Sequence, residues 1–81
     1  MNLHIIYTAS AVLISKKRYE SWQGIQDEYP DYRASLGTWS IKETEEYLDD
    51  EYQKIYPSAS EQLRGFAKSS NTVHIVSFSQ I

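Results

Sequence analysis

The two ends of this chain have the composition of β-strands, and most of what lies between them has helical spacing. Leu3–Thr8 and Thr72–Phe78 are short and rich in β-branched and aromatic residues, which is typical of strands. A sheet of two or three strands cannot bury its apolar face alone, so the helices must cover one side of it. The pattern predicts a single α+β domain over residues 1–81, a small two-layer fold with a mainly antiparallel sheet.

Two of the expected helices begin with capping boxes. In Ser40–Glu43 and again in Ser58–Glu61 a serine stands three residues before a glutamate, so each side chain can pair with the backbone amide of the other residue. The second of these helices is expected to end near Ser69. In the first, apolar or small side chains recur every three or four residues, at Ile41, Thr44, Leu48, Tyr52 and Ile55.

The segment before Pro30 allows more than one interpretation. Ala11–Ile14 is interpreted as a second strand that makes a hairpin with the first, and the alternative is the opening of a helix. A helix is predicted from Ser15, as its N-cap, to Tyr29, because Tyr19, Trp22 and Ile25 fall at helical spacing. Pro30 disfavours the helical conformation for the residue before it.

After Pro30, Asp31–Thr38 is expected to be a loop or a short turn of helix, with Gly37 marking a turn. The predicted order is therefore two strands, three helices and a final strand. That last strand is expected to return beside the first.

The 81-residue chain contains no cysteine, which excludes a disulfide framework, a thiolate zinc site and a cysteine nucleophile. No basic segment followed by a long apolar run stands at its start, and its longest aliphatic stretch, Ala11–Ile14, is far too short to span a bilayer. We therefore expect a cytoplasmic protein without membrane contact. The net charge of −3 argues against general binding to nucleic acid.

The clearest chemical feature of the sequence is acidic. Between Asp27 and Glu51 nine carboxylates stand against two cations, a local balance of −7 that leaves +4 on the rest of the chain. Like charges three or four residues apart destabilise a helix by roughly 0.2–0.5 kcal/mol per pair, so such a row is more than folding favours. Carboxylates beside tyrosines attract a cationic partner. The predicted partner-binding residues are Glu43, Glu46, Tyr47, Asp49, Asp50, Asp27, Glu28 and Asp31.

Two other interpretations of the acidic residues stay open. The carboxylates can form a solvated helix face that keeps a small protein in solution. A divalent-metal site is disfavoured, because Asp49-Asp50-Glu51 lacks the alternating ligand spacing and the central glycine of a calcium loop. No metal and no cofactor is predicted.

A basic cluster, Lys16-Lys17-Arg18, precedes the aromatic residues Tyr19 and Trp22. Three cations at the start of a predicted helix oppose the helix dipole, so helix stability does not explain them. Cations beside aromatic rings can bind phosphate backbones or stack bases. The alternatives are that they are solvated, or that they pair with acidic residues of the same chain or of a second copy.

The segment Ala11–Glu20, with the sequence AVLISKKRYE, resembles the strand–serine–helix junction of Phd/YefM-type antitoxins. In that family an apolar strand ends at a serine that caps a helix carrying a tyrosine. The resemblance covers roughly an eighth of the chain. A DNA-binding segment precedes the junction in the family, whereas only residues 1–10 precede it here, so the resemblance does not assign the family.

No arrangement typical of catalysis is found. His4 and His74 lie in similar strand settings, and strands paired in register would bring their imidazoles close enough for a titration near neutral pH or a weak metal site. Two histidines without a third ligand are poor evidence for zinc, and ordinary strand histidines are the simpler interpretation. No serine lies in a nucleophile elbow, and the three glycines are isolated. Trp22 and Trp39 are expected in the core or at its edge.

The preferred hypothesis is a small acidic, non-enzymatic interaction module that inhibits nucleic-acid-handling machinery, of the phage or mobile-element type, and that can imitate nucleic-acid phosphates. Its partner would be a cationic surface of a nucleic-acid-binding protein, with direct nucleic-acid binding disfavoured. The alternative is an antitoxin-like or nucleic-acid-binding regulator that uses Lys16, Lys17 and Arg18. A homodimer through exposed sheet edges is left open.

Overall fold

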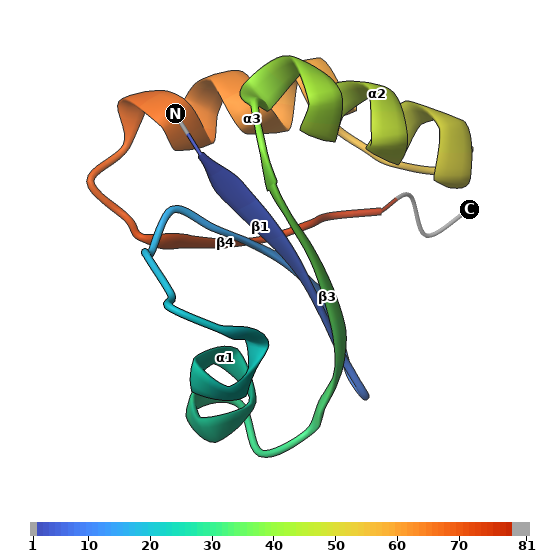
Figure 1. Cartoon of the computed structure of the whole chain (residues 1–81). Helices are drawn as coiled ribbons and strands as arrows, with labels where there is room; N and C mark the ends of the chain where they lie inside the picture. Colours follow the sequence, from blue (N-terminus) through green and yellow to red (C-terminus); the bar gives the residue numbers. More distant parts are fainter. Residues whose placement is uncertain (1, 79–81) are drawn as a thin grey trace.

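A computed structural model, which describes residues 2–78, shows a four-stranded sheet with three helices (Figure 1). The strands lie in the order β3-β1-β2-β4, and every neighbouring pair is antiparallel. The α+β class and the antiparallel sheet are confirmed, with four strands in place of two or three. The elements in chain order are β1 (Leu3–Thr8), β2 (Val12–Ser15), α1 (Trp22–Glu28), β3 (Tyr32–Trp39), α2 (Ile41–Glu51), α3 (Ala59–Lys68) and β4 (Val73–Ile75).

Helices cover both faces of the sheet, so the expected two-layer arrangement is wrong. On one face, α2 and α3 pack on side chains that include Leu3 and Ile14. On the other face, Ile25 of α1 packs on Ile6 and Leu13, and Figure 1 shows α1 on the opposite side of the sheet from α2 and α3. Successive strand residues point to opposite faces. Adjacent buried aliphatics in β1 and β2 therefore require cover on both sides.

Two predictions between Ser15 and Trp39 are wrong. Ser15 ends β2, and its Oγ accepts a hydrogen bond from the backbone N–H of Lys17 at 3.0 Å, so it caps no helix and α1 begins only at Trp22. The segment expected to be a loop lies in β3, which pairs with β1 along its whole length. β3 is an edge strand whose side chains are half-buried or exposed, so it lacks the apolar alternation that identifies a strand from sequence.

The hairpin formed by the Ala11–Ile14 segment is confirmed, because β2 pairs with β1 from Tyr7 opposite Val12 to His4 opposite Ser15. The final strand β4 is also antiparallel, but it pairs with β2 and not with β1. The last strand is therefore an edge of the sheet, next to β2.

The capping box of α2 is confirmed in full. Ser40 Oγ accepts from the Glu43 backbone N–H at 3.1 Å, and Glu43 Oε1 accepts from the Ser40 backbone N–H at 3.0 Å. Thr44 and Leu48 of the predicted stripe are buried. The helix ends at Glu51, earlier than the stripe suggested, and Ile55 instead forms a β-bridge with Phe78.

The N-terminus of α3 and its ties to the C-terminal segment depend on two polar side chains. Ser58 Oγ accepts from the Glu61 backbone N–H at 3.2 Å. The buried Gln62 donates through Nε2 to the carbonyls of Pro57 (2.6 Å) and Ser77 (2.9 Å). Its Oε1 accepts from the Ser77 backbone N–H at 2.9 Å and lies 2.8 Å from His74 Nε2. An amide oxygen is an acceptor only, so this His74 nitrogen carries the proton.

Candidate functional site

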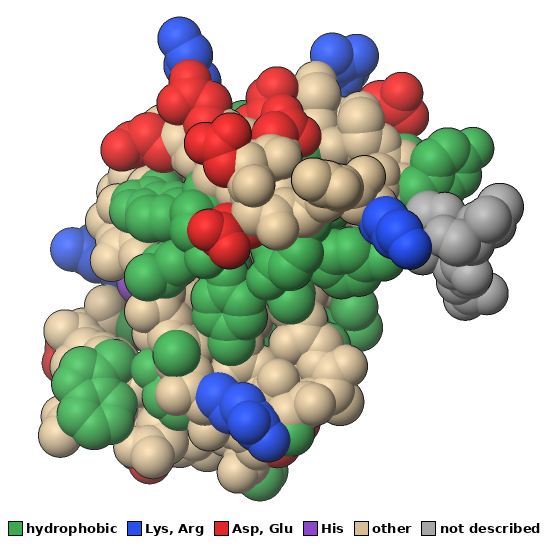
Figure 2. Space-filling model, turned by 90° about the vertical axis from the view of Figure 1, so that its right-hand side faces the viewer, with side chains coloured by type: hydrophobic (Ala, Val, Ile, Leu, Met, Phe, Trp, Pro, Cys, Tyr) green, Lys and Arg blue, Asp and Glu red, His purple; other side chains and the backbone are tan. Residues whose placement is uncertain are grey.

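The outward face of α2 is strongly acidic. Glu43, Glu46, Asp49 and Asp50 are all exposed, and Figure 2 shows carboxylates gathered at the top of that face above a band of hydrophobic side chains. Among residues 2–78, the one ion pair within 4.0 Å joins Lys17 to Glu28 and involves no residue of α2. The carboxylates of α2 are therefore not neutralised by ion pairs with the described lysines and arginines.

Three of these carboxylates border a shallow hollow of about 330 Å³. Its other two walls are the rings of Trp39 and Tyr47, which meet edge to face with centroids 5.0 Å apart and an interplanar angle of 62°. We call this group the α2 surface. It consists of Trp39, Glu43, Glu46, Tyr47 and Asp50.

The α2 surface is held in place by contacts with the sheet beneath it. The hydroxyl of Tyr47 lies 2.6 Å from that of Tyr7 on β1, and Trp39 is the last residue of β3, opposite Leu3. Burial, followed by hydrogen bonds to Tyr47 and Tyr52, raises the pKa of Tyr7. Hydrogen bonding by Ser40 lowers the pKa of Glu43, so this wall of the hollow stays anionic at neutral pH.

The other predicted acidic residues lie elsewhere. Asp27 and Glu28 belong to α1, which covers the opposite face of the sheet. Asp31 lies between α1 and β3 and accepts a hydrogen bond from Ser10 Oγ at 3.1 Å. The structure therefore brings together the predicted residues of α2 and does not bring these three to them. Asp49 is exposed on α2 but does not line the hollow.

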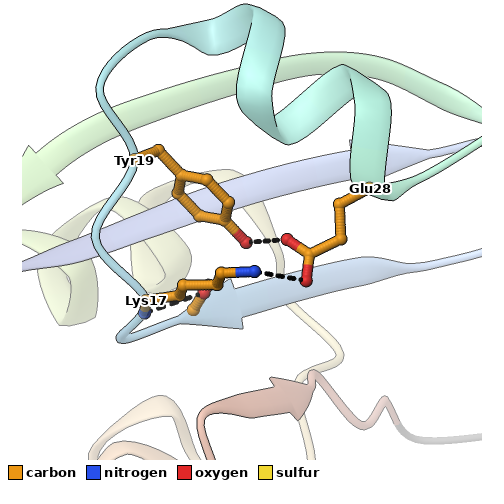
Figure 3. Close-up of polar contacts among 4 residues, drawn as sticks. Lys17, Tyr19 and Glu28 are labelled. Atoms are coloured by element: carbon orange, nitrogen blue, oxygen red, sulfur yellow. Dashed lines mark hydrogen bonds and ion pairs between the residues drawn. The ribbon is translucent and has the colours of Figure 1, made fainter.

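Glu28 is engaged by its own chain (Figure 3). Its Oε1 accepts from Lys17 Nζ at 3.0 Å, and its Oε2 accepts from the Tyr19 hydroxyl at 2.5 Å. These two hydrogen bonds, Tyr19 first, lower the pKa of the Glu28 carboxyl. Burial and the same contact raise the pKa of Tyr19.

The basic cluster lies in the loop between β2 and α1. Lys16 Nζ donates to the carbonyl of Ser69 at 2.9 Å and lies 4.3 Å from the centre of the Phe66 ring. Lys17 pairs with Glu28, and Arg18 is exposed. The three cations line a second hollow, of about 660 Å³, which we call the basic hollow. Its lining residues are Asn2, His4, Lys16, Lys17, Arg18, Tyr19 and Thr38.

The two histidines lie on opposite faces of the sheet. In the sheet register His4 is opposite Ser15, whereas His74 is opposite the preceding residue, Ile14. Since successive strand residues point to opposite faces, so do the two histidines. The His4 ring packs edge-on against Tyr19 with centroids 5.2 Å apart. Burial lowers the pKa of both imidazoles, and the two rings share no site.

Two tryptophans lie where the sequence did not indicate. Trp22, expected in the core or at its edge, is 56% exposed. Trp39 is half-buried, and its place as a wall of the α2 surface was not anticipated. The sequence did contain a signal for Trp39: it stands directly before the N-cap serine of α2, and Glu43 and Tyr47 follow on that helix.

Within residues 2–78, no three histidine, aspartate or glutamate side chains are placed to hold a metal ion. None of the helices in this described part combines the length and apolar character needed to cross a membrane. Comparisons with protein-family models, with curated proteins and with solved structures found no match.

Proposed function

We propose that this protein is a non-enzymatic interaction module that binds a cationic surface of another protein through the α2 surface. The observation that carries the proposal is the set of exposed carboxylates Glu43, Glu46 and Asp50 beside the Trp39–Tyr47 ring pair. Carboxylates in a row raise the rate of encounter with a positive partner. Tryptophan and tyrosine supply contact area and can pack against a cationic side chain.

The lack of ion pairs within the described chain supports this use of the carboxylates. No ion pair with a described cation involves α2, and only Glu43 serves a cap. Glu46 and Asp50 are four residues apart, so each repels the other on the same helix face. A lysyl or arginyl side chain that enters the hollow would relieve this repulsion and meet the aromatic rings.

The test compares two triple variants that remove the same number of charges. In Glu43→Gln/Glu46→Gln/Asp50→Asn the α2 surface loses its charge while glutamine keeps the capping box. In the matched control Glu20→Gln/Asp27→Asn/Asp31→Asn three exposed carboxylates outside α2 are neutralised. Binding of an oligo-arginine peptide is followed by fluorescence of Trp39, in a Trp22→Phe background, at several salt concentrations.

We expect the α2 variant to bind the peptide about tenfold more weakly at low salt, since three exposed charge contacts together are worth about 1.4 kcal/mol. Its affinity should also fall less with added salt. The control should lose about threefold or less. Equal losses in the two variants would show that the peptide responds to net charge alone and would refute the proposal.

The proposed partner class is nucleic-acid-handling machinery, with the α2 carboxylates taking the place of backbone phosphates. This inhibitor role is tested with sequence-nonspecific DNA-binding proteins and a labelled duplex. The protein should displace the duplex from at least one of them, and the α2 triple variant should not. Displacement by both, or by neither, would remove the mimicry from the proposal.

The alternative, a nucleic-acid-binding regulator that uses Lys16, Lys17 and Arg18, has less support because three cations are few for a site that follows a phosphate backbone. A gel-shift assay with mixed DNA and RNA distinguishes it. Retardation by the native chain that is lost in the triple alanine variant would favour the regulator over the module. No retardation by either would dismiss it.

A further inference from the structure

The basic hollow lies where β1 begins and β2 ends, and it shares no lining residue with the α2 surface. Asn2 and His4 come from the start of the chain, Thr38 comes from the end of β3, and the remaining walls follow β2. Gly37 shapes this end of the sheet. Its φ is +124°, and a Cβ added at this position would lie only 2.6 Å from the carbonyl oxygen of Leu3. A larger residue would therefore not fit here. β3 thereby approaches β1 closely beside His4.

The charge of this hollow is one-sided. Three of its lining residues are cations, and no aspartate or glutamate is among the described residues that line it. An ammonium group has three N–H donors. Lys16 uses one on Ser69 and Lys17 uses one on Glu28, so both retain donors for a ligand. Within residues 2–78, the carboxylate that pairs with a cation of this hollow is Glu28, which is shared between Lys17 and Tyr19.

The remaining lining groups suit a phosphate that is attached to something larger. Arg18 offers a planar fork of donors that matches phosphate oxygens, and Asn2 and Thr38 add neutral hydrogen-bonding groups. The rings of His4 and Tyr19 form a packed aromatic wall. A volume of about 660 Å³ falls within the range of sites for small molecules, roughly 300–1,000 Å³, and exceeds what a bare anion needs.

We propose that the basic hollow binds a small phosphate ester of nucleotide size. Lys16, Lys17 and Arg18 would hold the phosphate, and the organic part would lie against His4 and Tyr19. This site is independent of the α2 surface and of the partner proposed for it. Either can therefore fail without the other.

The test uses the full chain and isothermal titration with four probes: adenosine monophosphate, adenosine, inorganic phosphate and a single-stranded oligonucleotide. We expect adenosine monophosphate to bind, adenosine to bind at least tenfold more weakly, and inorganic phosphate to bind more weakly than the ester. Arg18→Ala should weaken binding of the ester about tenfold, because a charge-assisted fork is lost. Arg18→Lys should recover part of that loss.

Two further variants separate a local site from general charge. Lys54→Ala removes one cation from the segment between α2 and α3 and should change the affinity for the ester by less than twofold. Glu28→Gln removes the carboxylate that pairs with Lys17 and should strengthen binding of the ester about threefold. Equal weakening by Lys54→Ala and Arg18→Ala would overturn the proposal. So would binding of the oligonucleotide alone, equal affinity for ester and inorganic phosphate, or no binding of the ester at millimolar concentration.

Discussion

The two helical layers of this protein use the same residue types in different ways. Above the sheet, α2 and α3 bury a continuous core while the α2 carboxylates point outward without an ion pair among the described residues. Below it, α1 buries one side chain, Ile25, and its Glu28 is held by Lys17 and Tyr19. Counting the acidic residues along the sequence does not distinguish the carboxylates of α1 from those of α2. The contacts show that the charge of Glu28 is paired within the chain, whereas the α2 carboxylates have no ion pair among the described residues.

The largest expected effect concerns the two cores. Leu48→Ala should lower the free energy of unfolding by about 3 kcal/mol, since a buried leucine is lost and a cavity is left. Ile25→Ala should cost about 2 kcal/mol, because the short α1 can settle into the space. Urea denaturation followed by circular dichroism measures both. A larger loss for Ile25→Ala would show that the layer below the sheet is the main source of stability.

The second comparison sets a buried polar side chain against an exposed one. Gln62→Met should destabilise the fold by about 2 kcal/mol, because the carbonyls of Pro57 and Ser77 and the backbone N–H of Ser77 lose the buried amide that pairs with them. Glu28→Gln should cost less than about 1 kcal/mol, as is usual for a solvent-exposed ion pair. The same denaturation experiment checks both values. A cost for Gln62→Met below that of Glu28→Gln would contradict the assignment of Gln62 as the tie between α3 and the C-terminal segment.

The pH dependence of Glu28 gives a smaller but more specific signal. Its pKa is lowered in the folded chain from the ordinary value of 4.5. The carboxylate therefore contributes stability that is fully present above about pH 4.5 and is lost as the pH falls through the lower folded value. The difference in unfolding free energy between the native chain and Glu28→Gln should shrink over that range. A difference that stays constant from pH 7 to about pH 3 would contradict the contacts with Tyr19 and Lys17.

The smallest predicted effect has the opposite sign. Asp50→Asn should stabilise the fold by roughly 0.2–0.5 kcal/mol, because it removes repulsion from Glu46 and a negative charge near the C-terminal end of the helix. Glu43→Gln should bring no such gain, since Glu43 lies in the first turn and completes the cap. Thermal melts of the two single variants are compared. A destabilised Asp50→Asn would mean that the charge is part of the fold.

The sequence predicted best where local signals agree with the surrounding structure. The Ser40 capping box and the burial of Thr44 and Leu48 follow from short-range spacing, and both are observed. Grouping the α2 carboxylates on one exposed face follows from the same periodicity. These features depend on residues only three or four positions apart, which a single sequence records directly.

Most of the failures involve pairing or packing between distant segments. β3 is a strand because β1 offers a partner, although its own residues carry no strand pattern. Ser15 belongs to β2, so the helical spacing of the next residues is realised only from Trp22. Placing Asp27, Glu28 and Asp31 apart from α2 required knowing that α1 covers the other face. The signal for that was the adjacent buried pair Ile5 and Ile6 in β1.

The outer edge of β3 shows how this small sheet limits addition of further strands. Its pairing with β1 is regular only around Ile5, Ile6 and Tyr7, and the register shifts on either side of that stretch. Gly37, with its left-handed backbone, lies at one of the irregular ends. A foreign chain would thus find a straight template of only a few residues, too little for stable growth into a fibre. The eight residues of β3, all half-buried or exposed, thus offer little for edge-to-edge pairing.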